Sequence, residues 1–208
     1  MIYVDLSREI NYNNNKGEFM NKIDGLRKIN ELGLSVYPFI LYQNGMTLES
    51  LNNDNKYLLR KSTKDNQGTV SLGVDRNLTY DELIEKINAL KNDFNLIIQR
   101  ELDIKYYGIV SRFCSSNMDY LAIELFDTLK SFISGVPCDR LEYHYIDNEL
   151  IFRRSIPKEN VIKYVMYDIV KINYREFQLE FVASNNDIYY TDFDIIERGK
   201  KYEKSLFW

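Results

Sequence analysis

The chain is short of the residues that mark disulfide-rich, linker-rich or metal-binding proteins. Its 208 residues include only 2 cysteines (Cys114 and Cys138), 1 histidine, 3 prolines and 9 glycines. Two cysteines cannot make a disulfide framework, so we expect two free thiols and a reducing compartment. Few prolines and glycines leave little sequence for long linkers, which predicts dense regular structure.

Basic charge and long apolar segments are missing as well. Lys and Arg number 27 against 31 Asp and Glu, and the net charge of −4 argues against a nucleic-acid partner, because a phosphate backbone is bound by clustered Lys and Arg. Single-strand RNA binding through the 17 tyrosines is a weaker alternative. No apolar run approaches the ~18 residues of a membrane helix. The first residues, MIYVDLSRE, do not resemble a signal peptide. We therefore expect a cytoplasmic protein with no membrane partner.

Hydrophobic periodicity predicts helices among many strands. One helix follows Glu18 and ends at a Gly33 cap. Thr79 and Glu82 form a capping box before a second helix, and Pro157 fits the first turn of another. Strands are predicted at 2–4, 36–42, 56–60, 69–74, 95–102, 106–113 and 120–126, the last three as antiparallel neighbours, and hairpins at 141–153 and 177–196.

These elements predict an α+β fold of two lobes in one domain: a small lobe to about residue 77 and a larger lobe over about 78–208. Small ligands usually bind in clefts at such lobe boundaries. The sequence has no Walker-type Gly-Lys-Ser/Thr loop and no Cys/His spacing for a metal. His144 lies in a predicted strand and is expected to be a half-buried strand residue.

Short motifs in a fixed order run along most of the chain. They are Asn14 to Gly17 with Gly33 to Phe39, Arg60 to Ser62, Ile98 to Leu102 with Tyr107-Gly108, and Leu179 to Phe181 with Thr191 to Ile196. Together they resemble the N-terminal nucleotide-binding domain of the phosphoenolpyruvate synthase and pyruvate phosphate dikinase family. The resemblance implies an ATP-grasp-like fold, in which two lobes with a mainly antiparallel sheet clamp a nucleotide, with ATP and Mg²⁺ as cofactors.

The resemblance places Arg60 and Lys16 at the triphosphate, as catalytic cations. Arg60 ends an apolar strand, and an arginine can meet phosphate oxygens bidentately. Lys16 precedes a helix, where backbone N–H groups favour anions. Ser62 offers a hydroxyl to phosphate oxygens, while Gln99 and Glu101 alternate on the strand that the resemblance places beside the adenine. The alternative is that these are ordinary solvated, turn or edge-strand residues.

Glu180, Asp192 and Asp194 are the candidate magnesium ligands, and the resemblance also makes Glu180 a nucleotide-site residue. Asp192 and Asp194 are two residues apart on a strand and so share a face. With a three-residue turn over 185–187, Glu180 faces Asp192 and Gln178 faces Asp194. Three carboxylates on one face repel unless a cation intervenes, and Mg²⁺ takes such hard oxygen ligands. A slip of one residue would separate them, and solvated acids on an outer face are the alternative.

The chain departs from the family at two charged positions. Asp194 stands where the family has a catalytic arginine, and Lys130 stands where it has a loop glutamate. The resemblance implies an ATP- and Mg²⁺-dependent phosphotransferase or ligase-like enzyme that acts on a separate acceptor protein or small molecule. The two departures leave open a non-catalytic module that binds a nucleotide or a partner.

Overall fold

The structure is a computed structural model that describes residues 20–64, 72–115, 118–137, 139–146, 149–150, 159–185 and 187–195. Lys16, the predicted strand at 2–4 and residues 69–71 of another predicted strand lie outside the described residues. Among the described residues, no helix is long and apolar enough to cross a membrane.

Two compact units make up the chain. Unit 1 comprises Met1–Arg27 and Tyr37–Leu102, and unit 2 comprises Lys28–Val36 and Asp103–Trp208. This division differs from the lobe boundary expected near residue 77. Strand β4 (Asn95–Arg100) is hydrogen-bonded to β2 (Tyr57–Ser62), so one strand of the first sheet comes from residues well beyond that boundary.

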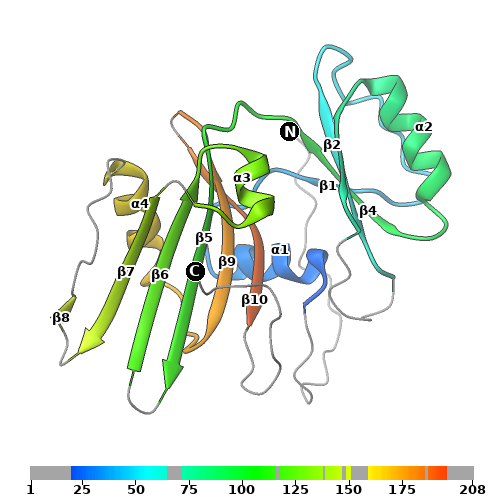
Figure 1. Cartoon of the computed structure of the whole chain (residues 1–208). Helices are drawn as coiled ribbons and strands as arrows, with labels where there is room; N and C mark the ends of the chain where they lie inside the picture. The colour runs from blue at the N-terminus through cyan, green and yellow to red at the C-terminus, as the bar shows by residue number, and fades with distance from the viewer. Residues whose placement is uncertain are drawn as a thin grey trace. The chain divides into compact units, whose positions relative to one another are not determined.

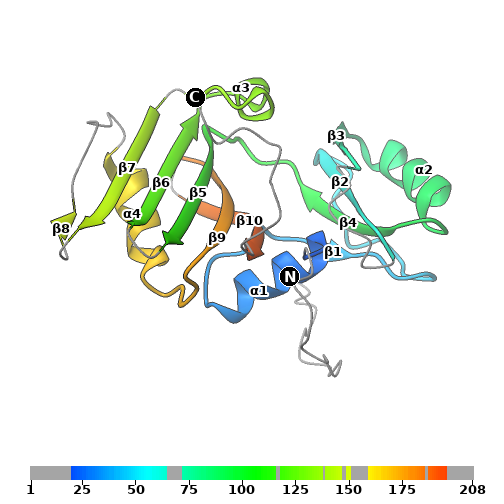
Figure 2. The ribbon, with the colours of Figure 1, turned by 60° about the horizontal axis from the view of Figure 1, so that its bottom comes forward.

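Unit 1 holds a four-stranded antiparallel sheet in the order β1-β4-β2-β3, where β1 is Ile40–Leu41 and β3 is Val74–Leu78. Helix α2 (Tyr80–Leu90) lies along this sheet (Figures 1 and 2). The capping box predicted for α2 is confirmed: the Thr79 hydroxyl accepts from Glu82 N at 3.3 Å, and Glu82 Oε2 accepts from Thr79 N at 2.8 Å. The core between helix and sheet contains Tyr57, Leu59, Leu78, Leu83, Ile87, Leu96 and Ile98.

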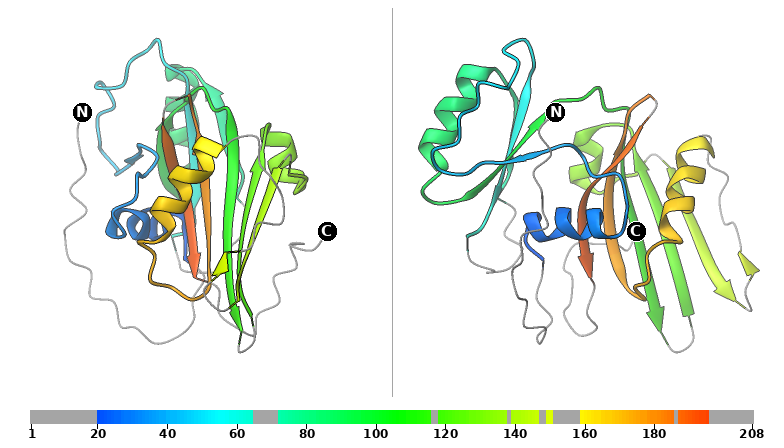
Figure 3. Two further views of the ribbon diagram at one scale, coloured as in Figure 1. Left: turned by 90° about the vertical axis from the view of Figure 1, so that its left-hand side faces the viewer. Right: turned by 180° about the vertical axis from the view of Figure 1, so that it is seen from behind.

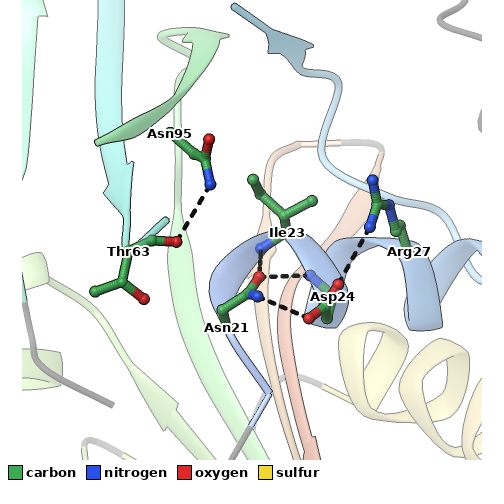
Figure 4. Close-up of polar contacts among 6 residues, drawn as sticks. All are labelled: Asn21, Ile23, Asp24, Arg27, Thr63 and Asn95. Atoms are coloured by element: carbon green, nitrogen blue, oxygen red, sulfur yellow. Dashed lines mark hydrogen bonds and ion pairs between the residues drawn. The ribbon is translucent and has the colours of Figure 1, made fainter. Parts of the chain in front are cut away.

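Helix α1 (Lys22–Glu31) begins in unit 1 and ends in unit 2. Asn21 Oδ1 caps its first turn by accepting hydrogen bonds from Ile23 N and Asp24 N, each at 3.0 Å (Figure 4). The predicted C-terminal cap is confirmed, because Gly33 has a φ of 68°, a left-handed conformation that suits glycine.

Unit 2 holds a six-stranded antiparallel sheet in the order β10-β9-β5-β6-β7-β8. The prediction that 95–102, 106–113 and 120–126 are neighbours is therefore right for the second pair only, since β4 belongs to the other sheet. The elements are β5 (Tyr106–Ser115), β6 (Met118–Phe126), α3 (Leu129–Ser134), β7 (Asp139–Ile146), β8 (Glu149–Leu150), α4 (Glu159–Ile169), β9 (Phe177–Ala183) and β10 (Ile188–Ile195).

The two faces of the six-stranded sheet differ in chemistry. Val110, Ile123 and Leu179 face one another on neighbouring strands and are fully buried. On this apolar face the Phe181 ring fills the space beside Gly108, where a Cβ would lie 2.1 Å from it. Helix α4 covers the apolar face, whereas the short helix α3 lies on the opposite side (Figure 3). We call that opposite side the polar face, because its central residues carry charged and polar groups.

Candidate functional site

In unit 1, the predicted nucleotide-binding residues of β2 and β4 share one face of the sheet. Leu58 is opposite Gln99, and Arg60 is opposite Ile97. Side chains alternate along a strand, and Leu59 packs against α2, so Arg60 and Ser62 project from the face opposite α2. Gln99 projects from the same face, because its neighbour Ile98 also belongs to the α2 core.

These side chains are buried rather than solvated. Arg60 is 9% exposed, Gln99 3% and Ser62 2%. Polar groups are rarely buried to this extent without a hydrogen-bonding or binding role. The alternative of an ordinary solvated residue at the end of a strand therefore does not hold for Arg60. Asn95, opposite Ser62, fixes the strand end by donating from Nδ2 to Thr63 O at 3.2 Å (Figure 4).

Gln99 and Glu101 are held in place by neighbouring groups. Gln99 Nε2 donates to Tyr37 O at 3.4 Å, and Tyr37 Oη donates to Arg100 O at 2.8 Å. Arg76 Nε and Nη2 both donate to one oxygen of Glu101, Oε1, at 3.0 and 2.5 Å. The partner Arg76 was not predicted, because its contact with Glu101 depends on how β3 is placed in the sheet.

Two buried oxygens on this face have no hydrogen-bond partner within the described part of the chain: Ser62 Oγ and Glu101 Oε2. A buried acceptor or hydroxyl without a partner costs free energy. A ligand that donates to Glu101 Oε2, or contacts the Ser62 hydroxyl, would remove that cost. Ser62 is opposite Asn95, whereas Glu101 follows Arg100, which is opposite Tyr57, so the two oxygens lie at opposite ends of this face.

In unit 2, the predicted pairing of the last hairpin is confirmed: Asp192 is opposite Glu180, and Asp194 is opposite Gln178. The turn and the first pairs of the hairpin differ from the predicted ones. The first pair is Ile188 with Ala183, which is the register of a four-residue connection. A bulge between Tyr190 and Asp192 then shifts the register by one residue and restores the predicted pairs.

The three candidate metal ligands differ in exposure. Asp192 is 4% exposed, whereas Glu180 and Asp194 are half-buried. Residues directly opposite each other project to the same face, so Glu180 and Asp192 are neighbours there. Among the residues that the structure describes, no group of three or more His, Cys, Asp or Glu side chains is placed to hold a metal ion. The role of Glu180, Asp192 and Asp194 as metal ligands thus stays a prediction that needs further oxygens from a bound molecule.

The polar face also carries an ionic cluster that the sequence analysis missed. Arg140 Nη1 donates to Glu124 Oε1 at 3.0 Å, and Nη2 donates to Tyr120 Oη at 3.0 Å. Arg140 Nε lies 2.7 Å from Glu142 Oε1. Burial raises the pKa of the Glu124 carboxyl, and the Arg140 guanidinium opposes that rise. We call these four residues the Arg140 cluster.

Two other predicted positions are placed by the structure. Lys130 is an exposed residue of α3, a helix that opens with a Thr128–Ser131 capping box and ends at Gly135. The resemblance implied a loop at this position rather than a helix. His144 lies in β7 opposite Tyr120, which confirms it as a strand residue.

No model of a known protein family matches the sequence, and no curated protein matches it. The structure, however, is similar to several solved enzymes. D-alanine-D-alanine ligase from Helicobacter pylori matches with a TM-score of 0.54 and 13% identity, over 85% of this chain and 51% of that one. N5-carboxyaminoimidazole synthetase from Staphylococcus aureus, complexed with ADP, matches with a TM-score of 0.51 and 16% identity, over 84% and 44%.

D-alanyl-alanine synthetase A from Vibrio cholerae gives a TM-score of 0.52 and 13% identity, over 84% of this chain and 54% of that one. The chain thus spans about half the length of these structures. All three are ATP-grasp enzymes, so the expected α+β, ATP-grasp-like fold is confirmed. They do not single out the phosphoenolpyruvate synthase and pyruvate phosphate dikinase family, and that narrower resemblance stays a prediction.

Proposed function

We propose that the protein binds ATP and acts as an ATP-dependent ligase-like enzyme or phosphotransferase on a separate acceptor. The observation that carries this proposal is the polar face of unit 1, where the buried Arg60, Ser62 and Gln99 project from two paired strands and the half-buried Glu101 directly follows the second strand. Buried positions of this kind are where a protein recognises a ligand rather than solvent. The ATP-grasp fold supports the choice of a nucleotide as that ligand.

Each residue has a role that fits its chemistry. Arg60 is the phosphate-binding cation, because its guanidinium can give two parallel hydrogen bonds to phosphate oxygens. Ser62 adds a hydroxyl beside it on the same strand face. Glu101 Oε2 and the Gln99 amide are suited to the donor and acceptor groups of the nucleoside. Lys16, which lies outside the described residues, is the second phosphate-binding cation in this proposal.

Glu180 and Asp192 are the proposed magnesium ligands, with Asp194 beside them. The pair fits the ion because Mg²⁺ is usually held by one or two carboxylates together with phosphate oxygens and water. A bound Mg²⁺ would offset the charge of the phosphate oxygens. The strand register places Glu180 opposite Asp192, so the chain itself supplies two carboxylates on one face for the proposed ion.

A non-catalytic module is the second candidate. It is favoured by Asp194 and by the exposed Lys130, which stand where the resembled family has a catalytic arginine and a glutamate. Such a module would keep nucleotide binding through unit 1 and lose turnover.

Calorimetric titration of the full chain with ADP and with a non-hydrolysable ATP analogue, with and without Mg²⁺, tests the proposal. Binding that Mg²⁺ strengthens, together with acceptor-dependent ADP release from ATP, is the expected result. Binding without any turnover in a broad acceptor screen would favour the non-catalytic module. Absence of binding by either nucleotide would contradict both candidates.

A further inference from the structure

We propose that the hydrogen bond between Tyr190 and Asp168 positions the candidate metal ligand Asp192. This inference rests on the proposed function, because it concerns how the chain presents a ligand of the proposed magnesium ion. Tyr190 and Asp168 are not ligands themselves, and they act through the backbone of β10. The family motifs in the sequence include neither residue.

The bulge in β10 decides which face Asp192 occupies. Side chains alternate along a regular strand, so Tyr190 and Asp192 would share a face if β10 were regular. In the structure Tyr190 is opposite Phe181, whose ring lies on the apolar face. Asp192 is opposite Glu180 on the polar face. Thr191, between them, is the extra residue that reverses the alternation, so the bulge aims Asp192 at the polar face.

Two side chains of β10, three residues apart, are both held on the apolar face. Tyr190 is fully buried, and its hydroxyl donates to Asp168 Oδ2 of α4 at 3.0 Å. Phe193 is also fully buried and stacks on Phe177, with ring centroids 5.8 Å apart. A spacing of three residues puts two side chains on one face of a strand only if the strand contains an extra residue. These two anchors together therefore require the bulge.

The anchor at Tyr190 is directional and charge-assisted. Lys171 Nζ lies 2.6 Å from Asp168 Oδ1 and so holds the carboxylate at the end of α4. The backbone N–H of Tyr190 donates to Ser35 O at 2.8 Å, beyond the edge of the sheet. Hydrogen bonds to charged groups are stronger than those between neutral groups. Without this bond β10 can return to regular alternation, which brings either the Tyr190 ring to the polar face or Asp192 to the apolar one.

The binding test uses the full chain and two variants that remove this bond. Tyr190→Phe deletes only the hydroxyl, and Asp168→Ala deletes its acceptor. In calorimetry, the affinity for ADP without Mg²⁺ should stay within about twofold of wild type. Both variants should lose most of the strengthening of ADP binding by Mg²⁺. Asp168→Asn should recover much of it, because an amide oxygen can still accept from the tyrosine hydroxyl.

Tyr57→Phe is the matched control, because it removes another buried tyrosine hydroxyl, which donates to Asn52 O at 2.8 Å in unit 1. It should keep the wild-type response to Mg²⁺ even where it lowers the melting temperature as much. Equal Mg²⁺ responses in wild type, Tyr190→Phe and Asp168→Ala would overturn the inference. A response lost as fully in Tyr57→Phe would overturn it too, because the loss would then follow stability alone.

Hydrogen exchange of the protein without metal or nucleotide tests the anchor directly. Backbone amides of β10 should exchange roughly tenfold faster or more in Tyr190→Phe and Asp168→Ala than in wild type, while those of β6 stay unchanged. Unchanged exchange in β10 would contradict the inference. Failure of the wild type to bind ADP or to respond to Mg²⁺ would contradict the proposed function instead, and the exchange rates would still decide whether Asp168 holds the bulge.

Discussion

Glu180→Gln is the change that separates a metal site from a merely acidic surface. In the folded protein Glu180 is directly opposite the buried Asp192, and both carboxylates are on the polar face. Like charges directly opposite on neighbouring strands destabilise a sheet by roughly 0.2–1 kcal/mol. Glutamine keeps the shape and removes one charge, so the free energy of unfolding without metal should rise by that amount.

The response to metal should change in the opposite direction. A ligand that binds only the folded state adds about 2.7 kcal/mol of stability at a concentration of 100 Kd. For a chain of this size that is roughly 5–11 °C in melting temperature. Wild type with ADP should show such a rise on addition of Mg²⁺, and Glu180→Gln should lose most of it.

Thermal unfolding with ADP, with and without Mg²⁺, measures both effects. Glu85→Gln, an exposed position on α2, is the matched control and should respond to Mg²⁺ as the wild type does. An equal Mg²⁺ response in Glu180→Gln and in wild type would refute the role of Glu180 in metal binding.

Three further outcomes follow from the fold. Thr79→Ala should lower the free energy of unfolding by about 1 kcal/mol through loss of the α2 cap, with ADP affinity unchanged in calorimetry. Gly108→Ala should destabilise unit 2 strongly, because the new Cβ would meet the Phe181 ring at 2.1 Å; a melting temperature equal to wild type would contradict the packing. Cys114 and Cys138 should both react with a thiol reagent when the protein is purified in its native state and then denatured. A disulfide found by mass spectrometry would count against a reducing compartment.

The last hairpin shows how sequence reasoning can reach the right pairs by an incomplete route. An assumed three-residue turn over 185–187 placed Glu180 opposite Asp192, and the structure confirms that pair although its strands begin from a different register. A bulge at this point was not foreseen, because bulges are set by how a strand packs on its neighbours rather than by its own residues. The local capping signals at Thr79 and Gly33 were predictable, since a cap depends only on nearby sequence.

Long-range pairing could not be predicted in the same way. β4 was assigned to the wrong neighbours, because its apolar run fits either sheet and only tertiary contacts decide between them. The Arg140 cluster was missed for a related reason. Arg140 is 16 residues from Glu124 and 20 from Tyr120, and it meets them only through the register of β6 and β7.

The most direct test of the account is the affinity for ADP of Arg60→Ala and Arg60→Lys, measured by calorimetry beside wild type. Loss of a charge-assisted pair costs roughly 1.5–3 kcal/mol, which is about 10- to 150-fold in Kd. Arg60→Ala should show that loss, and Arg60→Lys should recover only part of it, because an ammonium cannot form the bidentate contact. Arg27→Ala, which removes an arginine paired with Asp24 on α1, is the control and should bind as wild type does. Equal ADP affinity in wild type and Arg60→Ala would contradict the claim that the buried polar face of unit 1 holds the nucleotide.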